Sequence, residues 1–243
     1  MMKQQWIWIG ILGYLLMQAQ LANASQPENV GEPQSAETSD RSSNEVRLVV
    51  DLQLDKAVYG QTRYKNPPQF AVWLEHRDSG EIRTLYVTQK LGRGSWNGKP
   101  TVPVSLPHWV GRYNQQSNSQ GDPTAEHPLP DAITQPTPTD QFRITSHVAG
   151  NTRWYCCVEV NVSGDYNQSF PQKQADKTDA YGNGQPSIVY RAAIETRPGA
   201  QAAFKLVGHT SQHDVSPKLR ADTSQITSAQ KLFSRMRCSC VAK

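Results

Sequence analysis

The stretch Arg153–Asn167, RWYCCVEVNVSGDYN, is the strongest structural signal in the chain. Its side chains alternate with a period of two: one side carries Trp154, Cys156, Val158, Val160 and Val162, and the other carries Tyr155, Cys157, Glu159 and Asn161. This pattern is typical of a strand with one face on a core and the other in water. Ser163, Gly164 and Asp165 then supply turn chemistry. We therefore predict the central strand of an all-β domain.

Further strands are predicted on both sides of this stretch. Val46–Leu54 alternates in the same way, and Gln69–His76 with Ile82–Gln89 form a hairpin about the turn Asp78–Glu81. Other strands are expected at Gln141–Val148, Ile188–Ile194 and Ala202–Gly208, and a brief helical turn is expected to lead into a last strand from about Leu232. Leu91–Gly111 and Asn114–Pro138 are expected to be loops because neither shows a clear period.

Seven or eight strands joined mainly by turns and loops, without alternating helices, predict one all-β domain. The expected fold is an antiparallel β-sandwich of the immunoglobulin-like or jelly-roll type, with long irregular loops and at most short helical turns. A closed barrel remains the alternative, because counting strands does not separate the two. The domain is expected to span residues 45–243, a length that fits a single β-sandwich.

The first residues have the features of a secretory signal peptide. Lys3 precedes the apolar run Trp6–Met17, and Ala22, Asn23 and Ala24 form a cleavage site of the A-x-A type. A membrane span is the competing interpretation, but the run is shorter than the roughly 20 apolar residues that a span needs. We therefore expect a periplasmic protein cleaved after Ala24, with no span in the mature chain. Residues 25–44 are expected to be a disordered acidic leader.

The charge of the chain gives no support for a nucleic-acid partner. The formal net charge is +4 for 243 residues, and the charges are spread evenly. This balance does not favour a nucleic-acid partner. A periplasmic or inner-membrane protein, or a small ligand, is the expected partner, and the sequence does not indicate an oligomeric state.

Four cysteines, Cys156, Cys157, Cys238 and Cys240, allow three interpretations. In an oxidising compartment we expect disulfides, and the pairs that fit the predicted strands join Cys156 or Cys157 to Cys238 or Cys240. Buried free thiols are the second interpretation. The third is a thiolate metal site, to which His209 and His213 are weak additional candidates, although the CxxC spacing of zinc sites is missing. No cofactor is predicted, and a metal remains possible.

No sequence motif predicts catalysis. GxSxG and HExxH are absent, and the histidines are scattered, so the protein is more simply a binding module than an enzyme. A hydrolase whose site is assembled in space is the weakest hypothesis.

An aromatic segment supplies the candidate binding residues. Aromatic rings occur there with hydrogen-bonding groups, a mixture that binding sites favour, in Trp96, His108, Trp109, Arg112 and Tyr113. Asp165 and Tyr166 follow the central strand and are expected at the same end of the domain. The alternative for Trp96 and Trp109 is that they close the open ends of the sandwich.

Several segments, in order, resemble a family of predicted periplasmic proteins known as domain of unknown function 2271. They are NPPQFAVWLEHRDSGEIRTLYV, DAITQPTP, CCVEVNVSGDYNQSFP, GNGQPSIVYRA and ITSAQKLF, and the resemblance covers about Val46–Met236. It implies an exported all-β protein, and it carries over no catalytic residue. It also implies an association with membrane flavin reductases of the iron-uptake type, so a metal- or redox-linked accessory role is the alternative function. The four cysteines depart from the family pattern.

Overall fold

The computed structural model describes residues 44–89, 105–117, 133–135, 137–173 and 183–242. All of these residues belong to a unit that runs from Ser39 to Lys243. They form mainly β-structure, and no helix among them is long and apolar enough to cross a membrane. The predicted signal peptide, nearly all of the predicted leader and Trp96 lie outside the described residues.

Four strands form an antiparallel sheet in the order β5-β1-β10-β8. They are β1 (Glu45–Leu54), β5 (Gln141–Ala149), β8 (Gln201–Ala203) and β10 (Phe233–Val241). The short helix α1 (Lys56–Gly60) follows β1, and Asp55 caps it by accepting a hydrogen bond from the amide of Ala57. A 3-10 turn, η1 (Ala229–Lys231), precedes β10 and confirms the predicted helical turn and last strand.

Six strands form the second sheet in the order β4-β3-β2-β6-β7-β9. They are β2 (Gln69–His76), β3 (Ile82–Thr88), β4 (Ile133–Gln135), β6 (Arg153–Asn161), β7 (Ile188–Glu195) and β9 (Lys205–His209). All pairs are antiparallel except β3 with β4, which is parallel. β6 lies between β2 and β7, which confirms that it is a central strand, and β2 with β3 confirms the predicted hairpin.

The segment predicted as one strand, Ala202–Gly208, is divided between the two sheets. β8 pairs with β10 in the four-stranded sheet, and β9 pairs with β7 in the six-stranded sheet. The crossing falls at Phe204, which packs against the core between the sheets. A period-two pattern does not reveal such a crossing because alternation continues through it.

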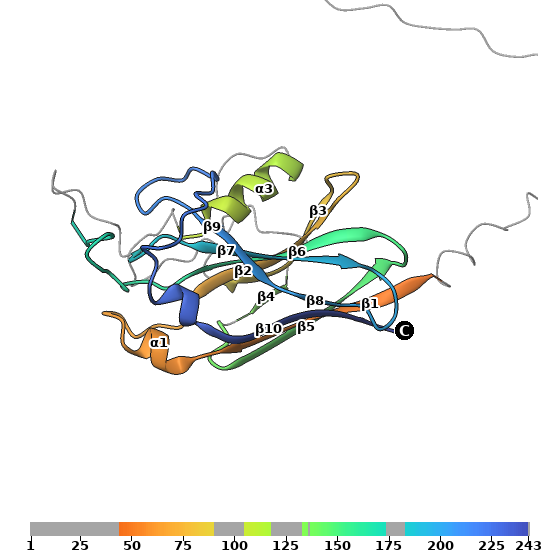
Figure 1. Ribbon diagram of the computed structural model, residues 1–243, viewed down its shortest axis with the longest axis horizontal. Helices are drawn as coiled ribbons and strands as arrows, with labels where there is room; N and C mark the ends of the chain where they lie inside the picture. The colour runs from red at the N-terminus through yellow and green to blue at the C-terminus, as the bar shows by residue number, and fades with distance from the viewer. Residues whose placement is uncertain (1–43, 90–104, 118–132, 136, 174–182, 243) are drawn as a thin grey trace, which may run out of the picture. The chain divides into compact units, whose positions relative to one another are not determined.

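An apolar core fills the space between the two sheets, which lie in separate layers in Figure 1. The predicted alternation supplies it: Val46, Leu48, Val50, Leu52 and Leu54 come from β1, and Trp154, Cys156, Val158 and Val160 come from β6. Each of these side chains is at most 5% exposed. Burial of one aliphatic side chain stabilises the fold by roughly 1.5–3 kcal/mol, so these facing rows hold the predicted sandwich together.

The outer face of the six-stranded sheet is also covered, which corrects the prediction that the second face of β6 is wet. Cys157, Glu159 and Asn161 on that face are fully buried. Helix α3 (Pro107–Ser117) lies over this face, on the side away from the four-stranded sheet (Figure 1). The polar side chains on its second face give β6 the sequence pattern of a half-buried strand. Such side chains can nevertheless be buried when they have hydrogen-bond partners.

Helix α3 also corrects the prediction of a loop and of only short helical turns. Leu106, Trp109, Val110 and Tyr113 stand at the i, i+3, i+4 and i+7 spacing of an apolar helix face. Pro107 suits the first helical position, where a missing amide hydrogen costs nothing. The helix therefore packs its apolar face on the sheet and brings its amino-terminal end over β6.

Candidate functional site

Helix α3 is anchored by a buried tryptophan. Trp109 is completely buried in a second apolar cluster, together with Trp73, Cys157 and Leu106. Its Nε1 donates a hydrogen bond to Oγ1 of Thr84 on β3 at 3.1 Å. The ring therefore lies in a core between the helix and the sheet. It neither lines an accessible binding surface nor closes an end of the sandwich, as the sequence suggested.

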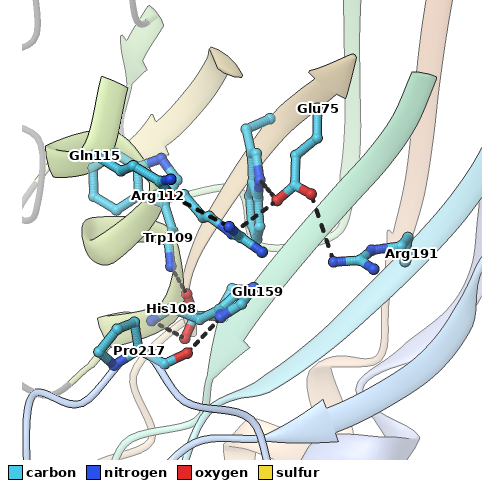
Figure 2. Close-up of polar contacts among 9 residues, drawn as sticks. Glu75, His108, Trp109, Arg112, Gln115, Glu159, Arg191 and Pro217 are labelled. Carbon is cyan, nitrogen blue, oxygen red and sulfur yellow. Dashed lines mark hydrogen bonds and ion pairs between the residues drawn. The ribbon is translucent and has the colours of Figure 1, made fainter. Parts of the chain in front are cut away.

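A buried carboxylate from β6 holds the beginning of the helix. Glu159 accepts hydrogen bonds from the backbone amides of His108 at 3.2 Å and Trp109 at 2.6 Å, and from the hydroxyl of Ser187 at 2.5 Å (Figure 2). The first amides of a helix have no intrahelical acceptor and carry partial positive charge, so they suit a carboxylate. Burial raises the pKa of Glu159 to about 7, and the three hydrogen bonds oppose this rise.

Because of this raised pKa, the difference in unfolding free energy between the wild-type protein and the variant Glu159→Gln is expected to depend on pH. A carboxyl group whose pKa is higher in the folded state stabilises the fold below its unfolded-state pKa of 4.5, and this contribution is lost as the pH rises through about 7. Between about pH 5 and about pH 8, the unfolding free energy of the wild type minus that of the variant should fall by on the order of 2 kcal/mol.

Urea denaturation of both proteins at a series of pH values measures this difference. Asp165 titrates in both proteins, so its contribution cancels in the comparison. A difference that stays constant with pH would show that Glu159 does not change protonation in this range.

A second group of charges lies beside the helix on the same outer face. Oε1 of Glu75, on β2, lies 3.3 Å from Nε of Arg112 on α3, and its Oε2 lies 3.6 Å from Nη2 of Arg191 on β7 (Figure 2). Nε1 of Trp73 donates a hydrogen bond to Oε1 at 3.0 Å. The side chain of Glu75 is only 13% exposed, so its charge is held in a poorly solvated place between two guanidinium groups.

The strand register explains how residues far apart in sequence reach this place. Trp73 on β2 pairs with Cys157 on β6, and Cys157 pairs with Arg191 on β7. Their side chains therefore share the outer face in one row across the sheet. Glu75 pairs with Tyr155 in the next row on the same face, and the guanidinium of Arg191 stacks over the Tyr155 ring at 4.8 Å.

His108 completes the group, which we call the α3 cluster: Glu75, His108, Arg112 and Arg191. Nδ1 of His108 lies 2.6 Å from the carbonyl oxygen of Pro217, and its Nε2 is buried without a hydrogen-bond partner in the described part of the chain. Burial is the main cause that lowers the pKa of His108, and the charges of Arg112 and Arg191 lower it further. In Figure 2 the imidazole lies between the carbonyl of Pro217 and the guanidinium of Arg112.

The structure brings together two of the predicted binding residues and separates the others. His108 and Arg112 belong to the α3 cluster, whereas Tyr113 stacks on Trp109 with ring centroids 5.9 Å apart. The sequence did not single out Glu75, Glu159 or Arg191 as site residues. The available signal for Glu159 is a charged residue on the second face of β6 whose neighbours across the sheet, Ala71 and Val189, are apolar.

Asp165 and Tyr166 belong to a different place. Asp165 accepts hydrogen bonds from the backbone amide of Gln185 at 2.8 Å and the hydroxyl of Ser228 at 2.9 Å. Burial raises the pKa of Asp165 to about 7, and these hydrogen bonds oppose the rise. Asp165 and Tyr166 line a cavity of about 500 Å³ together with Lys231, and no residue of α3 lines it. Asp165 and Tyr166 therefore line a different cavity from the residues of the aromatic segment.

The cysteines are free thiols, which corrects the expected disulfides. All four are buried, and none is bonded to another. Cys156, Cys238 and Cys240 lie in the core between the sheets, whereas Cys157 lies on the outer face of the six-stranded sheet. A strand directs adjacent side chains to opposite faces, so Cys157 cannot reach the C-terminal strand. The thiols of Cys156 and Cys238 hydrogen-bond each other across the core, and burial raises the pKa of Cys156.

The candidate metal ligands also lie apart from one another. His209 ends β9, where its Nδ1 lies 2.7 Å from the carbonyl oxygen of Thr210, and His213 follows in a segment without regular structure. Among residues 44–89, 105–117, 133–135, 137–173 and 183–242, no three His, Cys, Asp or Glu side chains are grouped as metal ligands. The cysteines and histidines therefore do not form one donor set there.

No family model, curated protein or solved structure matches the chain in the three comparisons. The resemblance to domain of unknown function 2271 therefore remains a prediction. Any functional role for the α3 cluster has to follow from its own geometry and charge.

Proposed function

We propose that this protein is an exported, non-enzymatic binding module, and that the α3 cluster binds the anionic group of a small ligand. The signal-peptide features of residues 1–24 support export to a periplasm. The family resemblance implies an association with a protein partner at the inner membrane.

The observation that carries this proposal is an excess of positive charge at a partly buried place. Arg112 and Arg191 carry two positive charges and Glu75 carries one negative charge, which leaves +1 because burial favours neutral His108. Nε of each arginine is buried, and that of Arg112 already faces Oε1 of Glu75 at 3.3 Å. A guanidinium presents a planar set of five donors that matches a carboxylate or phosphate, so an added anion would bind the remaining N–H groups of the two arginines.

Solvent access to the cluster also supports binding. The side chains of Arg112 and Arg191 are 36% and 27% exposed, so a solute in water can reach both. A fully buried pair of arginines would instead have a structural role only. The α3 cluster therefore combines a poorly solvated carboxylate with two arginines that water can reach.

The neighbouring thiol supports binding over covalent catalysis. Cys157 is completely buried beside Arg191, and burial raises its pKa far above the ordinary value of a thiol. A thiolate, and not a thiol, is the reactive nucleophile. Cys157 therefore remains protonated and unreactive at neutral pH.

The test is a titration of the mature protein, from Ser25 onward, with propionate and with inorganic phosphate. Amide chemical shifts of α3 are followed by NMR. A charge-assisted hydrogen bond contributes about 1.5–3 kcal/mol, so Arg191→Ala should weaken anion binding roughly 10- to 100-fold. The matched control is Arg143→Ala, which removes an exposed arginine paired with Asp51 on the four-stranded sheet.

The control should bind both anions as the wild type does. Melting curves show whether Arg191→Ala remains folded, and Arg112→Ala repeats the test from the helix side. If neither anion moves the α3 amides of the wild-type protein, or if Arg191→Ala binds as the wild type does, the proposed function is wrong.

A further inference from the structure

The protonation of His108 determines what its buried nitrogen can bind. The carbonyl oxygen of Pro217, 2.6 Å from Nδ1, is only an acceptor, so Nδ1 must carry a hydrogen. A neutral imidazole has one N–H, and Nε2 then presents a lone pair. Because the pKa of His108 is lowered, mainly by burial, the neutral ring predominates at neutral pH. Nε2 is therefore a hydrogen-bond acceptor.

This acceptor faces the same place as the two arginines. The charged groups that act on the imidazole are Arg112, Glu75 and Arg191, and Figure 2 shows the ring next to the guanidinium of Arg112. His108 is only 6% exposed, and its Nε2 has no hydrogen-bond partner within the described ranges. A buried polar atom without a partner is costly, so a ligand that donates to Nε2 gains affinity there.

The charge of the place restricts the ligand further. Arg112 and Arg191 require an anion, and their sum with Glu75 is +1, which matches a single negative charge better than two. The group that donates to Nε2 has to be uncharged, because an ammonium would be repelled by the two guanidinium groups. A hydroxyl beside a carboxylate has both properties.

We infer that the ligand of the α3 cluster is a small monohydroxycarboxylate, whose carboxylate binds Arg112 and Arg191 while its hydroxyl donates to Nε2 of His108. This inference rests on the proposed function and specifies its ligand. Glu75, fixed by Nε1 of Trp73, keeps the two guanidinium groups in place and limits the net charge that a ligand has to neutralise.

The test compares lactate with propionate, which are monoanions that differ by one hydroxyl group. Both are titrated into the mature protein at neutral pH, and amide shifts of α3 give the two dissociation constants. One added hydrogen bond predicts that lactate binds roughly 3- to 10-fold more tightly than propionate. In the variant His108→Asn this ratio should fall to about one, because a side-chain amide can still donate to Pro217 but has no counterpart of Nε2.

A second variant, in which His108 is unchanged, separates the effect of charge from the effect of the hydroxyl group. Glu75→Gln raises the net charge of the cluster, so both anions should bind several-fold more tightly while their ratio stays as in the wild type. Equal binding of lactate and propionate by the wild type would overturn the inference and leave the proposed function standing, and so would tighter binding of inorganic phosphate than of lactate. If no anion binds at all, the proposed function fails, and the inference fails with it.

Discussion

Glu159→Ala is expected to lower the free energy of unfolding by about 3 kcal/mol or more, because three buried donors lose their acceptor. The amides of His108 and Trp109 and the hydroxyl of Ser187 would remain buried without this acceptor. Truncation also leaves a cavity under the helix, which adds to the cost. Urea denaturation measures the loss, and amide hydrogen exchange should show that α3 opens first.

The matched control is Glu195→Ala, at an exposed glutamate on the neighbouring strand β7. Glu195 pairs with Arg197 at 3.3 Å, and its side chain is 53% exposed. Exposed ion pairs contribute little, so this variant should stay within about 0.5 kcal/mol of the wild type. A Glu159→Ala protein as stable as this control would show that the helix does not depend on the buried carboxylate.

Gly184→Ala is expected to destabilise the domain by about 2–4 kcal/mol, through strain and steric overlap. Gly184 has φ +74°, and a Cβ placed on it would lie 2.2 Å from Oδ1 and 2.6 Å from the backbone nitrogen of Asp165. The network in which Asp165 accepts hydrogen bonds from Gln185 would have to move. Thermal and urea denaturation should both show the loss.

Gly80→Ala is the control for the backbone contribution alone. Gly80 has the same φ of +74°, but a Cβ there meets nothing within 4 Å. It should cost only about 1 kcal/mol, the usual penalty of an alanine in the left-handed region. Equal losses in the two variants would mean that contact with Asp165 contributes nothing.

Much of the sandwich could be predicted because its strands follow a simple rule. Val46–Leu54 and Trp154–Val160 alternate strictly, and the buried row of each lies in the core between the sheets. The hairpin of β2 and β3 could be predicted because its turn is local and Gly80 supplies the positive φ. These elements depend on interactions between residues close in sequence or on period alone.

The coverage of the second sheet face could not be predicted in the same way. Glu159 in a row with Cys157 and Asn161 has the pattern of a solvated face, and its burial depends on a helix 50 residues away in sequence. That helix contains Gly111, and its segment is rich in aromatic and turn-forming residues without a clear period, which favours the prediction of a loop. The apolar spacing from Leu106 to Tyr113 was the available signal.

The α3 cluster was only half predictable. His108 and Arg112 lie on one helix, and the mixture of aromatic and polar residues in this segment predicts a binding site there. Glu75 and Arg191 come from strands on either side of β6, and only the register of the six-stranded sheet places them together. Sequence spacing carries no record of such a register, since it arises from two separate strand pairings, β2 with β6 and β6 with β7, and one helix contact.

The most direct test of the proposed binding site observes the arginine side chains themselves. In ¹⁵N-labelled mature protein, the Nε–H signals of Arg112 and Arg191 are recorded while lactate is added. Both signals should shift and saturate together with one dissociation constant, while the Nε–H signal of Arg143 on the four-stranded sheet should not move. Unchanged Arg112 and Arg191 signals at saturating lactate, or equal shifts at Arg143, would contradict binding at the α3 cluster.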